Sequence, residues 1–252
     1  MIQNARRLIG NWYAIPLLLL IWQVSVSTGL VTSRLLPGLP MVFEALTMAL
    51  ADGTLVYHAL ITVFRALTGF LLATIIGVPF AAAMANSVTI RNLCEPIFLF
   101  GYPIPKIALY PVFTYVFGLG SAPQIAFTFL ECLYPIVLSS FLSFRGITTH
   151  LIWTAKNFGA GRSTMFCRVI IPAAAPGIFS GLRIALPVAL IVVVLTEMIG
   201  SAAGLGYYIT ISSTRFTFQN VYAAIIVIGV CGLILDKSLL FLQRRVVKWE
   251  QV

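Results

Sequence analysis

Five ionisable side chains lie within apolar stretches of this 252-residue sequence. They are Arg65, Lys106, Glu131, Arg183 and Glu197. Because a charged side chain is costly to hold in hydrocarbon, each is a candidate for a functional site. The cations would suit an anion, and the carboxylates could carry protons.

Lys106 and Glu131 lie on either side of Gly120, the expected turn of a helical hairpin. Lys106 precedes this glycine by 14 residues and Glu131 follows it by 11. At 1.5 Å per residue their depths differ by about 4.5 Å, so the two charges could meet between antiparallel helices. Such a pair would either neutralise itself as a structural element or take part in a solute path.

Glu197 is followed closely by glycines, at Gly200, Gly204 and Gly206. Glycine lets a chain turn sharply and approach a solute closely. The segment could therefore be a gate or a tight loop, and the spacing favours the loop.

The sequence gives little support for metal binding, catalysis, nucleotide binding or nucleic-acid binding. The four cysteines lie far apart without a CxxC spacing, and no cluster of catalytic residue types occurs, so neither a metal site nor an enzyme is expected. His58 and His150 are expected on opposite sides of a membrane. The phosphate-binding pattern GxxxxGK[ST] is absent, so no nucleotide cofactor is expected on this chain. The 16 Lys and Arg residues are scattered between apolar runs, which argues against nucleic-acid binding.

The composition predicts a membrane protein. Hydrophobic residues make up 60% of the chain and charged residues 9%, against about 45–50% and about 25% in soluble domains. Too few polar residues remain to cover a core, so lipid must be the solvent for most of the surface. We expect an all-α, polytopic bundle forming one domain over residues 1–252, with spans near 14–31, 59–86, 96–118, 122–143, 177–199 and 220–242.

The distribution of cations predicts the orientation. Six spans place both termini on one side, and Lys and Arg mark the cytoplasmic side. Only Arg34 and Arg215 fall on the opposite side. The side with more cations holds Arg6, Arg7, Arg91, Arg145, Lys156, Arg162, Arg168, Lys237, Arg244, Arg245 and Lys248. Both termini and the loop near 146–176 are therefore expected in the cytoplasm.

Two spans carry ridges of small residues that recur every four positions. The ridges are Gly69, Ala73, Gly77, Ala81 and Ala85 in the second span, and Ala173, Gly177, Gly181, Ala185 and Ala189 in the fifth. Helices in lipid associate through close backbone approach along such ridges. The ridges favour paired helices at the centre of the protein, although Ala and Gly are also common in membrane helices generally.

Prolines interrupt the third span. Pro103, Pro105 and Pro111 each remove a backbone hydrogen bond. Together they predict a broken helix, of the kind tolerated where neighbouring helices or water satisfy the freed carbonyls.

The long loop at 146–176 has helix-compatible stretches on both sides of two glycines. One runs from about Ile147 to Phe158, and after Gly159 and Gly161 a second runs from Arg162 to near Pro172. A helix, turn and helix of this kind would suit a docking surface, although a plain connector is the simpler alternative.

The same loop resembles a signature of permeases in ABC importers, which reads EAA, three residues, Gly, nine residues, then Ile, any residue, Leu, Pro. The matching residues are Thr154, Ala155, Gly159, Val169, Ile171 and Pro172. Trp153 stands where the signature has Glu, so the ion pair which that Glu would make is absent or replaced by Lys156 or Arg162. LLPGLPMVFEAL, HALITVFRALTGF, PIPKIALYPVFTYVFGLG and TEMIGSAAGLGYYI, in this order, extend the resemblance to the nitrate, sulfonate and taurine branch of these permeases.

The resemblance implies a type I importer fold in a bacterial inner membrane. It implies a second copy of the chain as a homodimer partner, cytoplasmic ATPase subunits that hold ATP and Mg, and a periplasmic or lipid-anchored solute-binding protein. The solute would be small and anionic, such as nitrate, a sulfonate, taurine or bicarbonate. The candidates for its path are Arg65, Lys106, Glu131, Glu197, Gly204 and Gly206.

A proton-coupled secondary transporter is the alternative. It would use Glu131 and Glu197 as proton carriers and need no ATPase. Such folds often contain paired repeats, which this sequence does not display.

Overall fold

The computed structural model describes residues 14–31, 35–101 and 104–249. Arg6, Arg7, Arg34 and Pro103, which entered the predictions above, lie outside these ranges. The described residues form helices and no strand, so the prediction of an all-α fold is confirmed. The helices are α2 (Ala14–Ser27), α3 (Leu39–Ala51), α4 (Thr54–Asn86), α5 (Val88–Gly101), η1 (Lys106–Leu109), α6 (Tyr110–Phe117), α7 (Ser121–Arg145), α8 (Thr149–Asn157), α9 (Arg162–Met165), η2 (Phe166–Ile170), α10 (Ile171–Gly200), α11 (Leu205–Thr214) and α12 (Phe218–Val246).

Within the described ranges, four helical stretches are long and apolar enough to cross a membrane. They are Thr54–Asn86, Ser121–Arg145, Arg162–Gly200 and Phe218–Val246, and they correspond to the second, fourth, fifth and sixth predicted spans. In the first predicted span the structure describes α2 over 14 residues, Ala14–Ser27, and the residues before Ala14 lie outside the described ranges.

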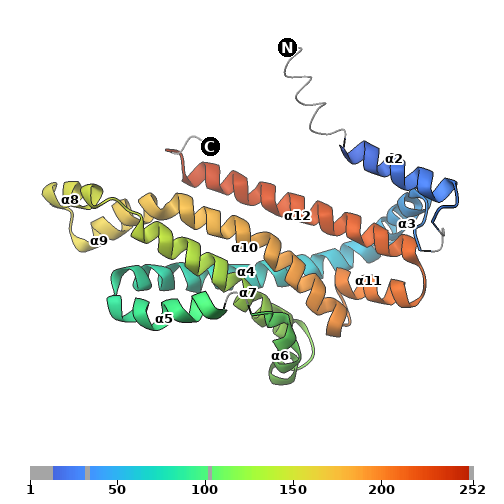
Figure 1. The fold of residues 1–252 in the computed structure, drawn as a ribbon, viewed down its shortest axis with the longest axis horizontal. Coiled ribbons are helices and arrows are strands. Elements are labelled where there is room, and N and C mark those ends of the chain that lie inside the picture. The colour runs from blue at the N-terminus through green and yellow to red at the C-terminus, as the bar shows by residue number, and fades with distance from the viewer. Residues whose placement is uncertain (1–13, 32–34, 102–103, 250–252) are drawn as a thin grey trace, which may run out of the picture.

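The third predicted span is interrupted. Helix α5 is described as far as Gly101, residues 104 and 105 are not helical, and the short 3-10 helix η1 that leads into α6 begins at Lys106. Pro111 sits in the first turn of α6, where its missing N–H would have no partner in the helix. Figure 1 shows α5 lying along α4 and α6 projecting away from the bundle.

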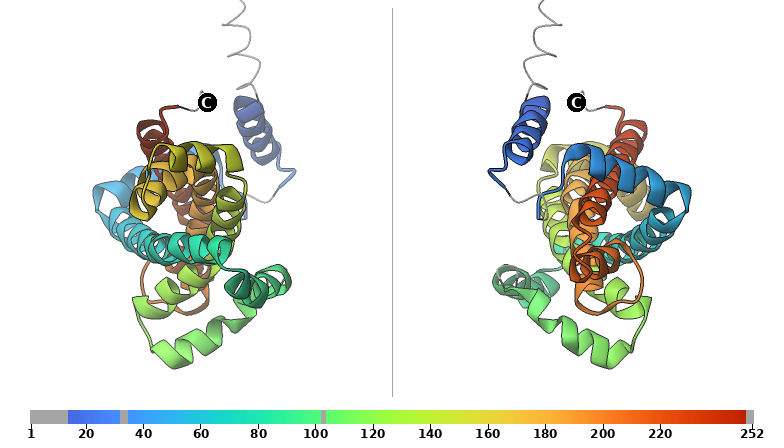
Figure 2. Two further views of the ribbon diagram at one scale, coloured as in Figure 1. Left: turned by 90° about the vertical axis from the view of Figure 1, so that its left-hand side faces the viewer. Right: turned by 90° about the vertical axis from the view of Figure 1, so that its right-hand side faces the viewer.

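The long helices α4, α7, α10 and α12 run along the bundle and separate its two ends (Figures 1 and 2). Helices α8 and α9 form one end, and α3 and α11 lie at the other. Helix α2 reaches the bundle through Trp22, whose ring centroid lies 4.9 Å from that of Tyr222 on α12.

Both ridges of small residues pack against α7. A methyl group added at Gly69 would lie 2.7 Å from Cβ of Thr128, and one added at Gly181 would lie 2.7 Å from Cβ of Ser139. The other two ridge glycines also lie close to α7. Gly77 faces Ile136, Leu133 and Val137, and Gly177 faces Ser143. The expectation that the ridges mark central helices therefore agrees with the structure, and the glycines of both ridges lie against α7. Towards α10, α7 presents the short side chains of Ser139 and Ser143, whereas towards α4 the glycines leave room for larger side chains of α7, such as Ile136.

The second helix of the long loop does not end near Pro172. The helical stretch runs without a break from Arg162 to Gly200 over 39 residues. Residues Phe166–Ile170 adopt a π-helix directly before Pro172. The wider turn of the π-helix leaves room for the proline ring, and it absorbs the loss of the hydrogen bond that proline cannot donate. The helix therefore continues past Pro172.

Candidate functional site

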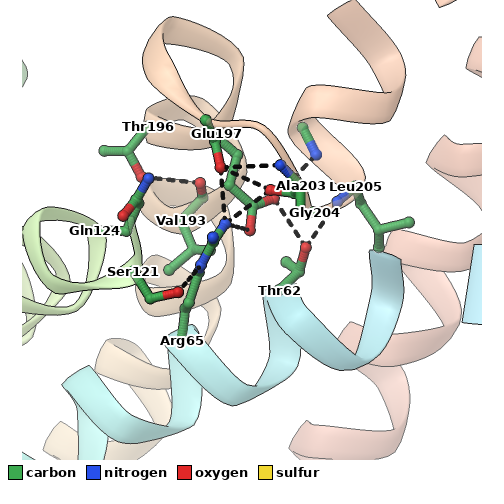
Figure 3. A network of polar contacts seen from close by, with 12 residues as sticks. Thr62, Arg65, Ser121, Gln124, Val193, Thr196, Glu197, Ala203, Gly204 and Leu205 are labelled. Carbon is green, nitrogen blue, oxygen red and sulfur yellow. Dashed lines mark hydrogen bonds and ion pairs between the residues drawn. The ribbon is translucent and has the colours of Figure 1, made fainter. Parts of the chain in front are cut away.

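Arg65 and Glu197 form an ion pair inside the bundle, at the end opposite α8 and α9. Arg65 Nη1 lies 2.8 Å from Glu197 Oε1, and the two side chains are 5% and 0% exposed. The hydroxyl of Thr62 and the backbone N–H of Gly206 both donate to the second carboxylate oxygen, at 2.8 and 3.0 Å. Glu197 is therefore enclosed by donors (Figure 3).

Arg65 makes further hydrogen bonds, and these connect separate elements of the fold. Its Nε donates to Ser121 Oγ at 2.9 Å, at the start of α7. Its Nη1 also donates to Ser201 Oγ at 3.1 Å and to the carbonyl of Ala203 at 2.8 Å. One guanidinium thus joins α4, α7, α10 and the loop that follows α10, and we call this arrangement the Arg65–Glu197 cluster.

Gly204 and Gly206 belong to the same cluster. Gly204 has a φ of +111°, and a Cβ there would collide with the carboxylate of Glu197. A Cβ at Gly206 would collide with the carbonyl oxygen of Val194. The Gly204 N–H donates to Nδ1 of His58 at 3.0 Å. These contacts favour the tight loop of the two alternatives that the sequence left open, since Gly204 and Gly206 both pack closely against α10, the helix that carries Glu197.

The polar partners of the pair were not identified from the sequence. His58, Thr62 and Arg65 recur at positions i, i+4 and i+7 of α4, so all three lie on one face of that helix. That spacing was a usable signal. Ser121 and Ser201 gave no such signal, because serine is common beside helix ends and in turns.

Lys106 and Glu131 are brought together at a second place. Lys106 Nζ lies 3.3 Å from Glu131 Oε2, and the two side chains are 9% and 17% exposed. The same ammonium lies 4.4 Å from the centre of the Tyr134 ring. The pair borders a cavity of about 390 Å³, whose opposite wall includes Ile184 and Val188 of α10.

Arg183, the fifth charge within an apolar stretch, lies apart from both places. Its Nη2 is 3.8 Å from Asp236 Oδ1 on α12, with side chains 41% and 35% exposed. No group of three or more His, Cys, Asp or Glu residues with the geometry of a metal site occurs within residues 14–31, 35–101 and 104–249.

Residues Thr149–Met165, which we call the loop segment, form the far end of the bundle. Helix α8 has no buried residue. Gly159 has a φ of +78° and open space around it, a conformation that suits glycine and ends α8. Trp153 and Phe158 are 58% and 87% exposed, and Lys156 and Arg162 are exposed beside them. The segment thus exposes aromatic and basic groups on its surface.

The other signature residues lie in two places, within α8 and around the start of α10. Thr154 is exposed and donates to the His150 carbonyl at 2.9 Å, whereas Ala155 is partly buried. Val169 and Pro172 are partly buried and Ile171 is exposed, at the transition from the π-helix to α10. An apolar cavity of about 840 Å³ separates the segment from α4 and is lined by Pro79, Phe144, Ile152 and Met165 among others.

Residues 56–249 match the family described as the inner membrane component of binding-protein-dependent transport systems. The chain belongs to this family. It is a permease of the ABC importer class, a transport subunit and not itself an enzyme. The expected resemblance to the permeases of the nitrate, sulfonate and taurine branch is confirmed.

Two relatives illustrate the similarity of this permease to that branch. It is 30% identical to the taurine transport system permease protein TauC of Escherichia coli over 241 residues, which cover 94% of this chain and 88% of TauC. It is 29% identical to the putative aliphatic sulfonates transport permease protein SsuC of Bacillus subtilis, over 91% of this chain and 83% of that protein.

A solved structure shares the fold of the permease. An inward-facing structure of the MetNI methionine ABC transporter superimposes with a TM-score of 0.64 at 17% identity, covering 74% of this chain and 93% of that one. The prediction of a type I importer fold is confirmed. The proton-coupled alternative is not favoured, and the enclosure of Glu197 by Arg65, Thr62 and Gly206 agrees with a fixed carboxylate.

Proposed function

We propose that two copies of this permease form the path of an ATP-driven importer in a bacterial plasma membrane. A separate cytoplasmic ATPase holds ATP and Mg and binds the loop segment, and a periplasmic or lipid-anchored binding protein delivers the solute. Both termini lie in the cytoplasm. The family to which the chain belongs supports the general scheme.

The observation that carries this proposal is the continuity of one helix. A single helical stretch joins the exposed loop segment, through the wall of the Lys106 cavity, to the Arg65–Glu197 cluster. Movement of the segment by an ATPase would be transmitted to Ile184 and Val188 directly, because an α-helix resists compression along its axis through its hydrogen bonds. The Arg65–Glu197 cluster acts as the fixed end of this movement.

The solute is a small sulfonate or a related anion. The names of the relatives, a taurine and an aliphatic sulfonate permease, support this class. Lys106 is the cation that borders the cavity, and the guanidinium of Arg65 is occupied within its own cluster. We therefore assign the solute path to the Lys106 cavity and a structural role to Arg65, Glu197, Gly204 and Gly206.

Substitution of Gly159 tests the coupling. Gly159→Asp introduces a side chain at a φ of +78° and a negative charge on the docking surface. Gly53→Asp is the matched control, because Gly53 has a φ of +79° and equally open surroundings in the turn between α3 and α4, away from the loop segment. The complex is purified from native membranes through a tag on the permease, and ATP hydrolysis and uptake of labelled taurine are measured in proteoliposomes.

We expect an ATPase to copurify with the unmodified permease. Gly159→Asp should insert normally but lose uptake while ATP hydrolysis continues or the ATPase dissociates, and Gly53→Asp should retain uptake. Normal ATP-dependent uptake by Gly159→Asp, or the failure of any ATPase to copurify, would count against the proposal.

A further inference from the structure

The break in the third predicted span places a charged pair at the wall of a cavity. Lys106 begins η1, at the point where the chain resumes a helical conformation after Gly101. Non-helical backbone within a membrane protein is stable only where it is buried in protein or lines a polar space. The cavity beside it is bordered by Ile104, Lys106, Ile107, Glu131, Ile184 and Val188.

The pair carries no net charge, which restricts what can bind beside it. An anion that approached Lys106 would draw the ammonium away from Glu131 and leave this carboxylate without its cation. A simple amine would draw the Glu131 carboxylate towards itself and leave the Lys106 ammonium without its partner. Leaving one member of a largely buried ion pair without its partner is unfavourable, so a solute that carries a single charge binds beside this pair less tightly than one that carries both charges.

A solute that carries both charges avoids this penalty. Its acidic group would face the Lys106 ammonium and its ammonium would face the Glu131 carboxylate, so the single ion pair of 3.3 Å is replaced by a ring of alternating charges. The two protein charges lie close together, which suits a solute whose own charges are separated by only two or three carbon atoms.

An aromatic ring lies beside the pair. The Tyr134 ring already receives the Lys106 ammonium on its face, at 4.4 Å from the ring centre. The electron-rich face of such a ring stabilises an ammonium group whether a lysine or a ligand supplies it. The apolar wall formed by Ile184 and Val188 would cover the short carbon chain between the two charges of the solute.

We propose that the Lys106 cavity binds a short zwitterionic aminosulfonate in preference to a sulfonate without an amino group. The inference rests on the proposed transport function and deepens it, because Glu131 becomes the residue that selects for the amino group. Lys106 binds the sulfonate, and Tyr134 positions the Lys106 ammonium.

Binding to the purified permease in lipid nanodiscs tests the inference. Taurine is the zwitterionic probe, and ethanesulfonate has the same chain and acidic group without the ammonium. The affinity for each is measured by calorimetric titration. We expect taurine to bind more tightly by roughly tenfold or more, the value of one charge-assisted hydrogen bond.

Three variants identify the selecting residue. Glu131→Gln should reduce the preference for taurine to less than about threefold, whereas Glu95→Gln, a matched change on α5 away from the cavity wall, should leave it unaltered. The double variant Lys106→Glu/Glu131→Lys keeps both charges and should retain the preference for taurine over ethanesulfonate, with taurine bound in the opposite orientation. It provides the test if Glu131→Gln proves unstable on gel filtration.

Equal affinities for the two probes, unchanged in Glu131→Gln, would overturn the inference and leave the proposed anion path standing. Absence of binding by either probe at 10 mM would overturn the site itself. A failure of the proposed function looks different, since taurine would still bind with the stated preference while no ATPase copurified.

Discussion

Removal of Arg65 should destabilise the permease more than any other single loss of charge described above. In Arg65→Met the Glu197 carboxylate, whose side chain is 0% exposed, loses its cation. Breaking a buried pair by removal of one partner costs about 3–5 kcal/mol. At about 2–4 °C per kcal/mol for a chain of this size, the melting temperature should fall by roughly 10 °C.

The double variant Arg65→Met/Glu197→Met should recover part of this loss. It contains no unpaired charge, but the Gly206 N–H loses its acceptor, whereas the Thr62 hydroxyl keeps the His58 carbonyl as an acceptor. We expect a destabilisation of about 1–3 kcal/mol, smaller than that of Arg65→Met alone. Arg215→Met is the control, because it removes an exposed arginine from the same end of the bundle.

Melting temperatures are measured in one detergent at one protein concentration, by intrinsic fluorescence and by retention on gel filtration after heating. If Arg65→Met melted within 2 °C of Arg215→Met, the cluster would not be the fixed end that we describe. The same conclusion would follow if the double variant were less stable than Arg65→Met.

Three further substitutions test other parts of the structure. Gly69→Leu should separate α4 from α7 and lower the melting temperature by several degrees, whereas Gly229→Leu, which has open space around its Cα, should change it by less than about 2 °C. Lys106→Ala and Glu131→Ala should have effects on stability that are not additive, because the two side chains are in contact at 3.3 Å; additive effects would contradict the pairing. Trp153→Glu should not tighten the docking of the ATPase, measured by its retention on the immobilised permease, because an exposed aromatic surface offers shape and apolar area more than charge.

The sequence predicted one of the two buried charge pairs and not the other, for a physical reason. Lys106 and Glu131 flank a single turn, so helix geometry alone fixes their relative depth. Arg65 and Glu197 are 132 residues apart, and no local rule places α4 beside α10. Both residues could be recognised as unusual, but only the folded chain shows that each is the other's partner.

The same distinction applies to the packing of the helices. A ridge such as that of Gly69 and Gly77 indicates that another helix approaches closely, but it contains no information on which helix does so. Thr128, Ser139 and Ser143 on α7 look unremarkable one at a time, and they identify α7 as the shared neighbour only when the glycines opposite them are known. The effect of Pro172 was predicted wrongly because a proline is expected to end a helix, and the π-helix before it supplies the exception.

The unbroken helix from Arg162 to Gly200 has a consequence for the lengths that this chain can tolerate. Each residue of an α-helix turns it by about 100° and advances it by 1.5 Å. One inserted residue between Ile171 and Glu197 would therefore rotate Glu197 away from Arg65 if the loop segment kept its position, or swing the loop segment around the bundle if Glu197 kept its own. Point substitutions along this helix are local events, whereas an insertion or deletion changes the angle between its two ends. Sequences that share this architecture should accordingly vary in residue type along the helix while holding its length constant.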